Sequence, residues 1–163
     1  MTELDDAAGL ATSLESVELA LWFHDAVYDT RALDNEEQSA VLARQCLTEA
    51  AVEVALVERI EGLVMATKSH AITRDPDTAL MLDVDLSILG QSEKRFAEYE
   101  AAIRQEYYWV PENTFTTERA KILERFLARE RLYITDQFFR KYEVQARLNL
   151  EQSLAVLKSR AQP

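Results

Sequence analysis

The feature that most limits the possible folds is the near absence of chain-breaking residues: the 163 residues include only 3 Gly and 3 Pro. A β-sandwich needs a turn about every 8–12 residues, and such turns use these two residues heavily. Ala, Leu, Glu and Arg are abundant instead, and all four are strong helix formers. The most strand-like run, residues 132–135, is short and lies between helical segments. We therefore expect an all-α fold.

The length fits one domain, since domains commonly run to about 100–150 residues. No internal repeat, low-complexity tract or obvious linker interrupts the chain. We predict a single domain over residues 1–163, built as a bundle of about six to seven helices from the 3.6-residue apolar period. We expect residues 1–12 to be frayed, as chain termini often are.

The first helices are bounded by recognisable signals. A helix beginning at Ser13 or Ser16 carries His24 and Tyr28 on its apolar stripe. Asp34 is suited to cap the next helix, with Glu37 completing a capping box. That helix is expected to turn residues 41, 42, 45 and 46 inward. The following helix covers residues 53–70 and ends at His70.

The later helices are punctuated by Pro, Ser and Gly. Pro76 suits a first helical turn, and a short apolar helix over residues 78–89 is expected to stop at Gly90. Ser92 can cap the next helix, and Pro111 ends it. Two more helices are expected, one from near Thr116 and one over residues 136–158.

The net charge and the absence of targeting signals limit the expected partners and location of the protein. A formal net charge of −11 repels nucleic-acid backbones, so we expect no nucleic-acid binding. A small anionic substrate remains compatible, because a bound metal ion reverses the local field. The first residues lack the basic and apolar regions of a signal peptide, and no apolar run approaches the ~20 residues that span a bilayer. The single cysteine, Cys46, fits a reducing compartment. We expect a cytoplasmic protein without membrane contact.

Both histidines of the chain lie on apolar helical stripes. His24 and Asp25 are adjacent within an apolar stretch, and a buried carboxylate costs several kcal/mol unless it is paired or binds a metal. Alone, such a dipeptide is more often an internal hydrogen-bonded pair or a solvated helix edge. A lone His70 at a helix end more often interacts with the helix dipole.

Asp83 and Asp85 interrupt a run of Leu, Met, Val and Ile. They lie about 200° apart on a helix, so at least one is expected to face the interior. Surface exposure on a thin polar stripe is the alternative. Taken with the histidines, these carboxylates form a ligand set typical of Mn, Fe, Zn or Mg. Such a cation would activate a bound water and hold a phosphoryl oxygen.

These segments resemble the HD superfamily of helical metal-dependent phosphohydrolases, and in particular a bacterial group of predicted HD-domain phosphohydrolases. The resemblance covers roughly residues 15–152, and the stretches are specific as a set although no single one is. The resembling stretches are residues 19–29, 35–40, 66–70, 82–90, 103–107, 119–123 and 143–150.

The resemblance implies a role for each polar residue of these stretches. His24 and Asp25 correspond to the central metal-ligand pair and Asp85 to the distal ligand, with Asp83 beside it. The ion would be Mn, Fe, Mg, Zn or Ni. Asp29, which is expected one helical turn after Asp25, is a candidate proton-transfer group.

The remaining roles concern catalysis and the substrate. His70 is implied as a second catalytic group that assists proton transfer, and it shares its cleft with Glu36. Lys68 and Arg104 are the cations expected to contact a substrate phosphate. The predicted function is therefore hydrolysis of a small phosphate ester or nucleotide through a metal-activated water.

One departure leaves alternatives open. The family supplies a further His ligand from a helix before the His–Asp pair, and no residue before His24 is a histidine. The chain start could be truncated or misplaced, three protein ligands could suffice, or metal binding could be lost. A missing helix would expose apolar core that a second copy of the chain could cover. The rival functions are a catalytically impaired module that binds a nucleotide or protein partner, and a structural bundle in which His24 pairs internally with Asp25.

Overall fold

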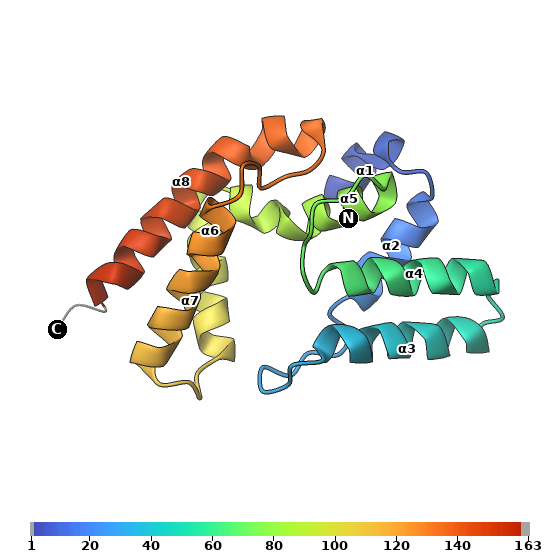
Figure 1. Cartoon of the computed structure of the whole chain (residues 1–163), viewed down its shortest axis with the longest axis horizontal. Helices are drawn as coiled ribbons and strands as arrows, with labels where there is room; N and C mark the ends of the chain where they lie inside the picture. Colours follow the sequence, from blue (N-terminus) through green and yellow to red (C-terminus); the bar gives the residue numbers. More distant parts are fainter. Residues whose placement is uncertain (1, 161–163) are drawn as a thin grey trace. The chain divides into compact units, whose positions relative to one another are not determined.

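A computed structural model describes residues 2–160 (Figure 1). Within that range the chain is all-α and contains no strand, which confirms the predicted fold class. Two short 3-10 helices, η1 (Ala8–Leu10) and η2 (Leu86–Gly90), accompany the α-helices. The α-helices are α1 (Thr2–Asp6), α2 (Leu14–Phe23), α3 (Asn35–Glu49), α4 (Val54–Ala66), α5 (Pro76–Asp85), α6 (Glu93–Glu106), α7 (Glu112–Leu127) and α8 (Asp136–Arg160).

The described residues fall into two compact units that divide between Asp85 and Leu86, which we call unit 1 and unit 2. The sequence contained no signal for this division, because α5 leads directly into η2 without a Gly-rich or Ser-rich linker. All the residues implied as metal ligands belong to unit 1.

In unit 1, α3 and α4 lie side by side, and α2 packs against α4 and α5 (Figure 1). Each helix contributes small and branched apolar side chains at helical spacing. Burying such side chains contributes roughly 25 cal/mol for each Å² of apolar surface removed from water. The fully or nearly fully buried residues are Val17, Ala20, Ala43, Val57, Ile60, Leu63, Val64, Leu80, Met81 and Leu82.

The described residues at the start of the chain form α1 and η1, and the fraying of residues 1–12 stays a prediction. Leu4 of α1 is buried in the core. The backbone N–H groups of Thr12 and Ser13 donate to Oδ1 of Asp77 at 2.6 and 3.1 Å, and Arg59 donates to Oδ2 of Asp77 at 2.9 Å. This buried carboxylate therefore fixes the entry to α2. Residue 1 lies outside the described residues.

The inner face of α3 differs from the predicted one. Its buried residues are Ser39, Ala40, Ala43 and Leu47, whereas residues 41, 45 and 46 are exposed. Hydrophobic periodicity predicted the wrong buried face of α3, because most side chains on the buried face are small. Small residues let α3 approach α4 closely but add little to an apolar pattern.

The N-terminus of α3 was located correctly, but its predicted capping box does not form. Asp34 occupies the N-cap position without a side-chain bond to the helix backbone, and its Oδ2 accepts from Nε2 of Gln38 at 3.1 Å. Glu37 forms an ion pair with Lys68 instead. The ammonium group of Lys68 adds the attraction of a full opposite charge, so Glu37 pairs with it instead of with the cap.

The predicted helix over residues 78–89 is two elements in the structure. α5 begins at Pro76, as its position in a first turn predicted, and η2 follows from Leu86. Gly90 ends η2, but it does not adopt the positive φ expected of a helix-ending glycine. A Cβ at Gly90 would lie 2.5 Å from Cβ of Tyr142, so this glycine is required by the close approach of α8.

In unit 2, α7 and α8 lie side by side and η2 packs against α8 (Figure 1). Ser92 caps α6 as predicted, accepting from the N–H of Arg95 at 3.4 Å. α7 begins at Glu112, directly after Pro111 and earlier than the predicted start near Thr116.

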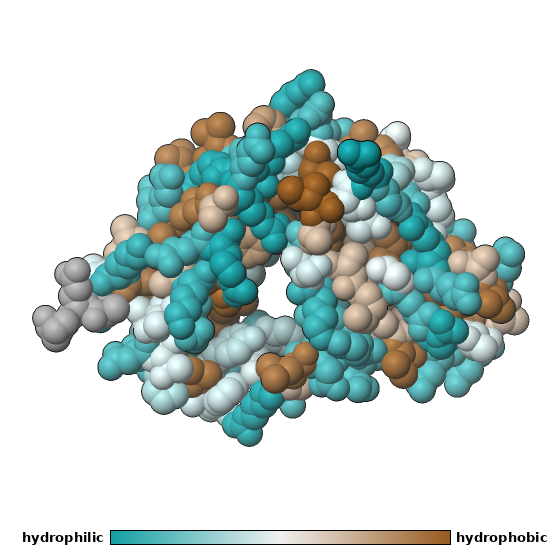
Figure 2. All heavy atoms as spheres, in the orientation of Figure 1, coloured by the Kyte–Doolittle hydropathy of each residue, from teal (hydrophilic) through white to brown (hydrophobic). Residues whose placement is uncertain are grey.

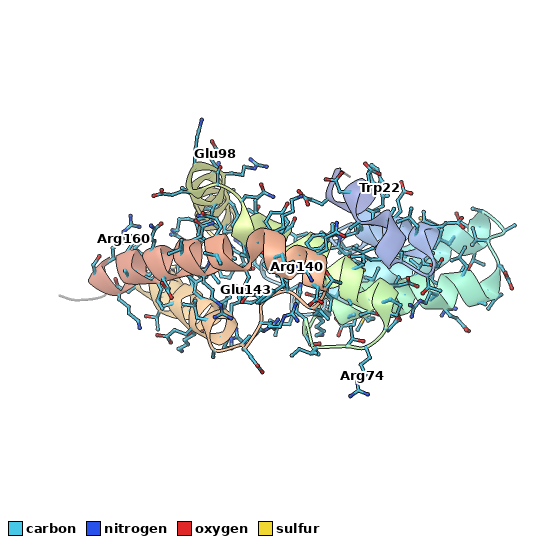
Figure 3. The ribbon with its side chains drawn as sticks, turned by 90° about the horizontal axis from the view of Figure 1, so that it is seen from above. Trp22, Arg74, Glu98, Arg140, Glu143 and Arg160 are labelled. Atoms are coloured by element: carbon cyan, nitrogen blue, oxygen red, sulfur yellow. The ribbon has the colours of Figure 1, made fainter. Side chains whose placement is uncertain are left out.

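A buried carboxylate organises the connection between α7 and α8. Glu143, labelled on α8 in Figure 3, accepts from the N–H of Leu132 at 2.9 Å and from that of Tyr133 at 3.3 Å. Its Oε1 pairs with Arg147 at 2.7 Å. Arg147 in turn donates to the carbonyl of Arg129 at 2.8 Å. The irregular segment between the helices is thus held by side chains of α8.

The surface is mixed in polarity. On the face drawn in Figure 2, hydrophilic side chains predominate and apolar ones form small patches. Arg74 projects from the α4–α5 connection away from the ribbon in Figure 3. Leu33 and Ile72 are the most exposed large apolar residues of unit 1, at 91% and 76%. The predicted second copy that would cover apolar surface stays a prediction. None of the helices within residues 2–160 combines the length and apolar character needed to cross a bilayer.

Candidate metal centre

The two histidines of the chain converge on one carboxylate in unit 1. Nε2 of His70 lies 2.7 Å from Oδ2 of Asp85, and Nε2 of His24 lies 3.4 Å from Oδ1 of the same residue. Oδ2 of Asp25 lies 3.3 Å from Nε2 of His24. The structure therefore brings His70 and Asp85 to the adjacent pair His24 and Asp25, from three separate segments of the chain.

His24 is held by the end of α2. Its N–H donates to the carbonyl of Ala20 at 2.9 Å, so it forms the C-cap of the helix. Its Nδ1 lies 2.8 Å from the carbonyl of Leu21. Because a carbonyl only accepts, Nδ1 carries a proton, and Nε2 is the ring nitrogen that faces the carboxylates.

His70 lies beyond α4 rather than at its end as predicted. α4 stops at Ala66, and the N–H of His70 donates to the Ala66 carbonyl at 3.1 Å. His70 has φ of 48°, in the left-handed region that costs a non-glycine residue roughly 1–2 kcal/mol. The contact with Asp85 offsets part of that cost.

Asp83 and Asp85, near the end of α5, are both withdrawn from solvent. Asp83 is buried and the side chain of Asp85 is 22% exposed, which confirms that at least one faces the interior. Burial raises the pKa of Asp85, but hydrogen bonds from His24 and His70 outweigh it and hold that pKa well below its usual range. Asp85 is thus an anion whose two oxygens each face an imidazole.

The charge state of His24 follows from the same contacts. Burial lowers the pKa of His24, but the hydrogen bond with Asp85 and the charges of Asp85 and Asp25 more than compensate. The net effect raises the pKa of His24 to about 9. In the metal-free protein at neutral pH, His24 is an imidazolium between two carboxylates.

A pH dependence of stability follows. The folded pKa of His24 is raised from 6.5 to about 9, so its contribution is complete below pH 6.5 and is lost as pH rises through 9. We expect the free energy of unfolding of the metal-free protein to fall by up to about 3 kcal/mol over this interval. Urea unfolding at several pH values measures it.

The matched variant for this experiment is His24→Gln, which should flatten the decrease between pH 6.5 and 9. An equally steep decrease in that variant would contradict the assignment. On the acid side, the contribution of Asp85 is present above the ordinary Asp pKa of 3.8 and is lost as pH falls below it.

Asp29 and Glu36, predicted as proton-transfer and cleft residues, flank the same connection. α2 ends at Phe23, so Asp29 does not follow Asp25 on a continuing helix, and that expectation was wrong. Oδ1 of Asp29 accepts from the N–H of Arg31 at 2.9 Å. Glu36 lies half-buried in the first turn of α3. Their catalytic and binding roles stay predictions.

Lys68, a predicted phosphate contact, lies two residues before His70 and forms an ion pair with Glu37. The shared hydrogen bond raises the pKa of Lys68 and lowers that of Glu37. Both side chains are about 40% exposed, at 41% and 39%, so a ligand in solution can reach the pair. A phosphate would have to compete with Glu37 for the ammonium group.

Arg104, the other predicted phosphate contact, belongs to α6 in unit 2. It donates to the carbonyls of Tyr107 and Val110 at 2.8 and 3.0 Å and pairs with Glu112 at 3.0 Å. It also lines a groove of about 530 Å³ formed by α6, α7 and α8. These contacts give Arg104 a structural role within unit 2, and its contact with a substrate stays a prediction.

The donor atoms of the site form a row of neighbouring contacts, from Asp25 to His24, from His24 to Asp85 and from Asp85 to His70. Within residues 2–160, no three His, Cys, Asp or Glu side chains are arranged as a ready metal site. The arrangement is a row of two imidazoles and two carboxylates joined by charge contacts, of which His70–Asp85 is a short hydrogen bond.

Sequence reasoning missed two residues that hold the connection after the His–Asp pair. Asn35 and Ser39, both on α3, bond to the backbone of Asp29 and Val27. The signal available in the sequence was a polar pair at i and i+4 on one helix face. It was overlooked because the inner face of α3 was assigned to other residues.

Comparisons with models of protein families, with curated proteins and with solved structures give no significant match to this chain.

Proposed function

We propose that unit 1 holds a divalent cation with His24, His70, Asp85 and Asp25, and that this centre hydrolyses a small phosphate ester or nucleotide. The observation that carries the proposal is the convergence of the chain's only two histidines, by Nε2, on the two oxygens of Asp85. Neither histidine is near the other in sequence, and each reaches the carboxylate from a different helix end.

The donor spacing fits a common cation. Imidazole and carboxylate ligands lie about 2.0–2.2 Å from a metal ion, so two ligands at roughly right-angled or tetrahedral positions are about 3–3.5 Å apart. The His24–Asp25 and His24–Asp85 separations of 3.3 and 3.4 Å are of this size, whereas the His70–Asp85 separation of 2.7 Å is that of a direct hydrogen bond. Imidazole with carboxylate suits Mn, Fe, Zn or Ni better than a soft metal.

Once bound, a divalent cation supplies Lewis acidity, which neutralises phosphate charge and acidifies water. The chain's own residues set up the rest. The hydrogen bond from Nδ1 to the Leu21 carbonyl orients the His24 ring. Asp25, 67% exposed, keeps one side of the site open to a substrate. Lys68 supplies a cation to a phosphate oxygen in place of its bond to Glu37, and Asp29 is a candidate to accept a proton.

The choice of phosphate esters rests on the resemblance to the HD superfamily together with this centre. A catalytically impaired module with the same fold would share the ligand set, so binding and turnover have to be measured separately. A purely structural ion-pair network would bind no metal.

The test is metal binding by the purified full chain. Calorimetry and thermal unfolding with Mn²⁺, Ni²⁺, Zn²⁺ and Mg²⁺ should show saturable binding by at least one ion. A ligand at about 100 times its Kd stabilises the folded state by about 2.7 kcal/mol, which raises the melting temperature measurably. The metal-loaded protein is then assayed with a panel of phosphomonoesters, phosphodiesters and nucleotides for phosphate release.

Three outcomes separate the alternatives. Metal binding with phosphate release supports the proposal in full. Metal binding without release from any substrate in the panel favours the non-catalytic module. If none of the four ions binds or shifts the melting temperature, the metal centre is contradicted. The contacts of His24 and Asp85 are then a purely structural ion-pair network.

A further inference from the structure

Two side chains of α3 are bonded to the segment that follows His24 and Asp25 in an unusual pattern. Oδ1 of Asn35 accepts from the N–H of Asp29 at 2.9 Å, and Nδ2 of Asn35 donates to the Asp29 carbonyl at 2.9 Å. Oγ of Ser39 accepts from the N–H of Val27 at 3.0 Å and lies 3.2 Å from the Val27 carbonyl, to which it donates. Each side chain thus satisfies both backbone groups of one residue. We call this arrangement the two-rung clamp.

Asn35 and Ser39 are four residues apart on α3, so they share a face and are separated by a rise of about 6 Å. They bind Asp29 and Val27, which are two residues apart in the connecting segment. The segment is therefore held against α3 at two points.

The clamp acts near Asp25, which lies beyond the C-cap of α2. Asp25 is the most exposed of the four candidate ligands, at 67%, whereas His24 caps α2 and Asp85 ends α5. The position of Asp25 next to Nε2 of His24 depends on the path of the backbone just after it. Ser39, which is fully buried, fixes that path at Val27.

We propose that Asn35 and Ser39 are positioning residues that keep Asp25 beside His24 for cation binding. This inference rests on the proposed metal function. The clamp touches no ligand atom and acts only through the chain between Asp25 and Asp29. Its removal therefore weakens the contribution of Asp25 and leaves His24, His70 and Asp85 in place.

The test uses the full chain and Mn²⁺ as the probe. Asn35→Ala and Ser39→Ala are compared with Gln45→Ala, a control at an exposed position of α3. Amide exchange in the metal-free protein should accelerate at least about tenfold at Asp29 in the first variant and at Val27 in the second, because each amide loses its acceptor. The Kd for Mn²⁺ should rise about 10- to 100-fold in both, as for other residues that orient metal ligands.

A double-mutant cycle separates positioning from general destabilisation. If the clamp acts through Asp25, Asn35→Ala added to Asp25→Ala should weaken Mn²⁺ binding no further. Since Ser39 is buried and its variant could fail to fold, the half-buried Asn35 carries the cycle. The conservative Asn35→Asp keeps the acceptor for the Asp29 N–H and should retain more protection at that amide than Asn35→Ala.

The failures of the two proposals are distinguishable. If the wild type binds Mn²⁺ and both clamp variants bind as tightly as Gln45→Ala, the positioning role is overturned and the metal centre stands. Fully additive losses in the cycle also overturn it. If the wild type binds no Mn²⁺ while the amides of Val27 and Asp29 respond as expected, the metal centre fails and the positioning role fails with it.

Discussion

Asp85→Asn is expected to abolish cation binding and, with it, phosphate-ester hydrolysis. Asp85 contacts both histidines and is the central residue of the proposed ligand set. The amide keeps the shape of the carboxylate but carries no charge and offers only one oxygen. Residues that merely orient ligands change metal affinity about 10- to 100-fold, so we expect loss of a central ligand to raise the Kd for Mn²⁺ more than about 100-fold. Calorimetry on the folded variant measures this Kd.

The matched control is Asp77→Asn, which removes another carboxylate charge from α5. Asp77 is buried and binds the N–H groups of Thr12 and Ser13 together with Arg59. Its loss should lower the melting temperature but leave the Mn²⁺ affinity of the folded protein close to that of the wild type. Equal Mn²⁺ affinity in Asp85→Asn and the wild type would show that Asp85 is not a ligand.

Of the variants proposed, Glu143→Ala is expected to lower the free energy of unfolding most, by about 3–5 kcal/mol. The substitution leaves the guanidinium of Arg147 without its carboxylate and the N–H groups of Leu132 and Tyr133 without their acceptor. Buried donors that lose their partner cost about 1–3 kcal/mol each, and more when charged. Urea unfolding followed by far-UV circular dichroism measures the change.

Glu151→Ala is the control for this measurement, because Glu151 is an exposed residue of the same helix. Surface substitutions of this kind usually change stability by no more than about 0.5 kcal/mol. Glu143→Gln keeps an oxygen for the backbone donors and should fall between the two. A Glu143→Ala change as small as that of Glu151→Ala would show that the bonds of Glu143 contribute nothing net.

Much of the fold was predictable because helix signals are local. Helical composition indicated the all-α class, and Pro76 and Ser92 marked helix starts that the structure confirms. The convergence of His24 and Asp85 was predictable for a related reason. Both are polar residues set in apolar stretches, and such residues need a partner when they are buried, whereas Asp25 lies 67% exposed.

The rest depended on contacts between distant segments. The chain turns at His70 because this residue adopts a left-handed φ of 48°. Such turns usually carry Gly or Asn, and the sequence has neither near His70, so the turn could not be predicted. Gly90 was assigned to a helix end, whereas its true constraint is the ring of Tyr142, which comes from another helix. The clamp residue Ser39 was missed because a small buried hydroxyl does not stand out from a helical pattern.

The placement of the site at helix ends has an electrostatic consequence. His24 follows α2, His70 follows α4 and Asp85 is the last residue of α5, so the carbonyl ends of three helices are directed to one region of unit 1. Each such end carries a partial negative charge of up to about half an electron. The region is therefore negative in potential through its backbone as well as its carboxylates. A phosphate group alone is repelled there, so under the proposed function the cation would bind before the anionic substrate.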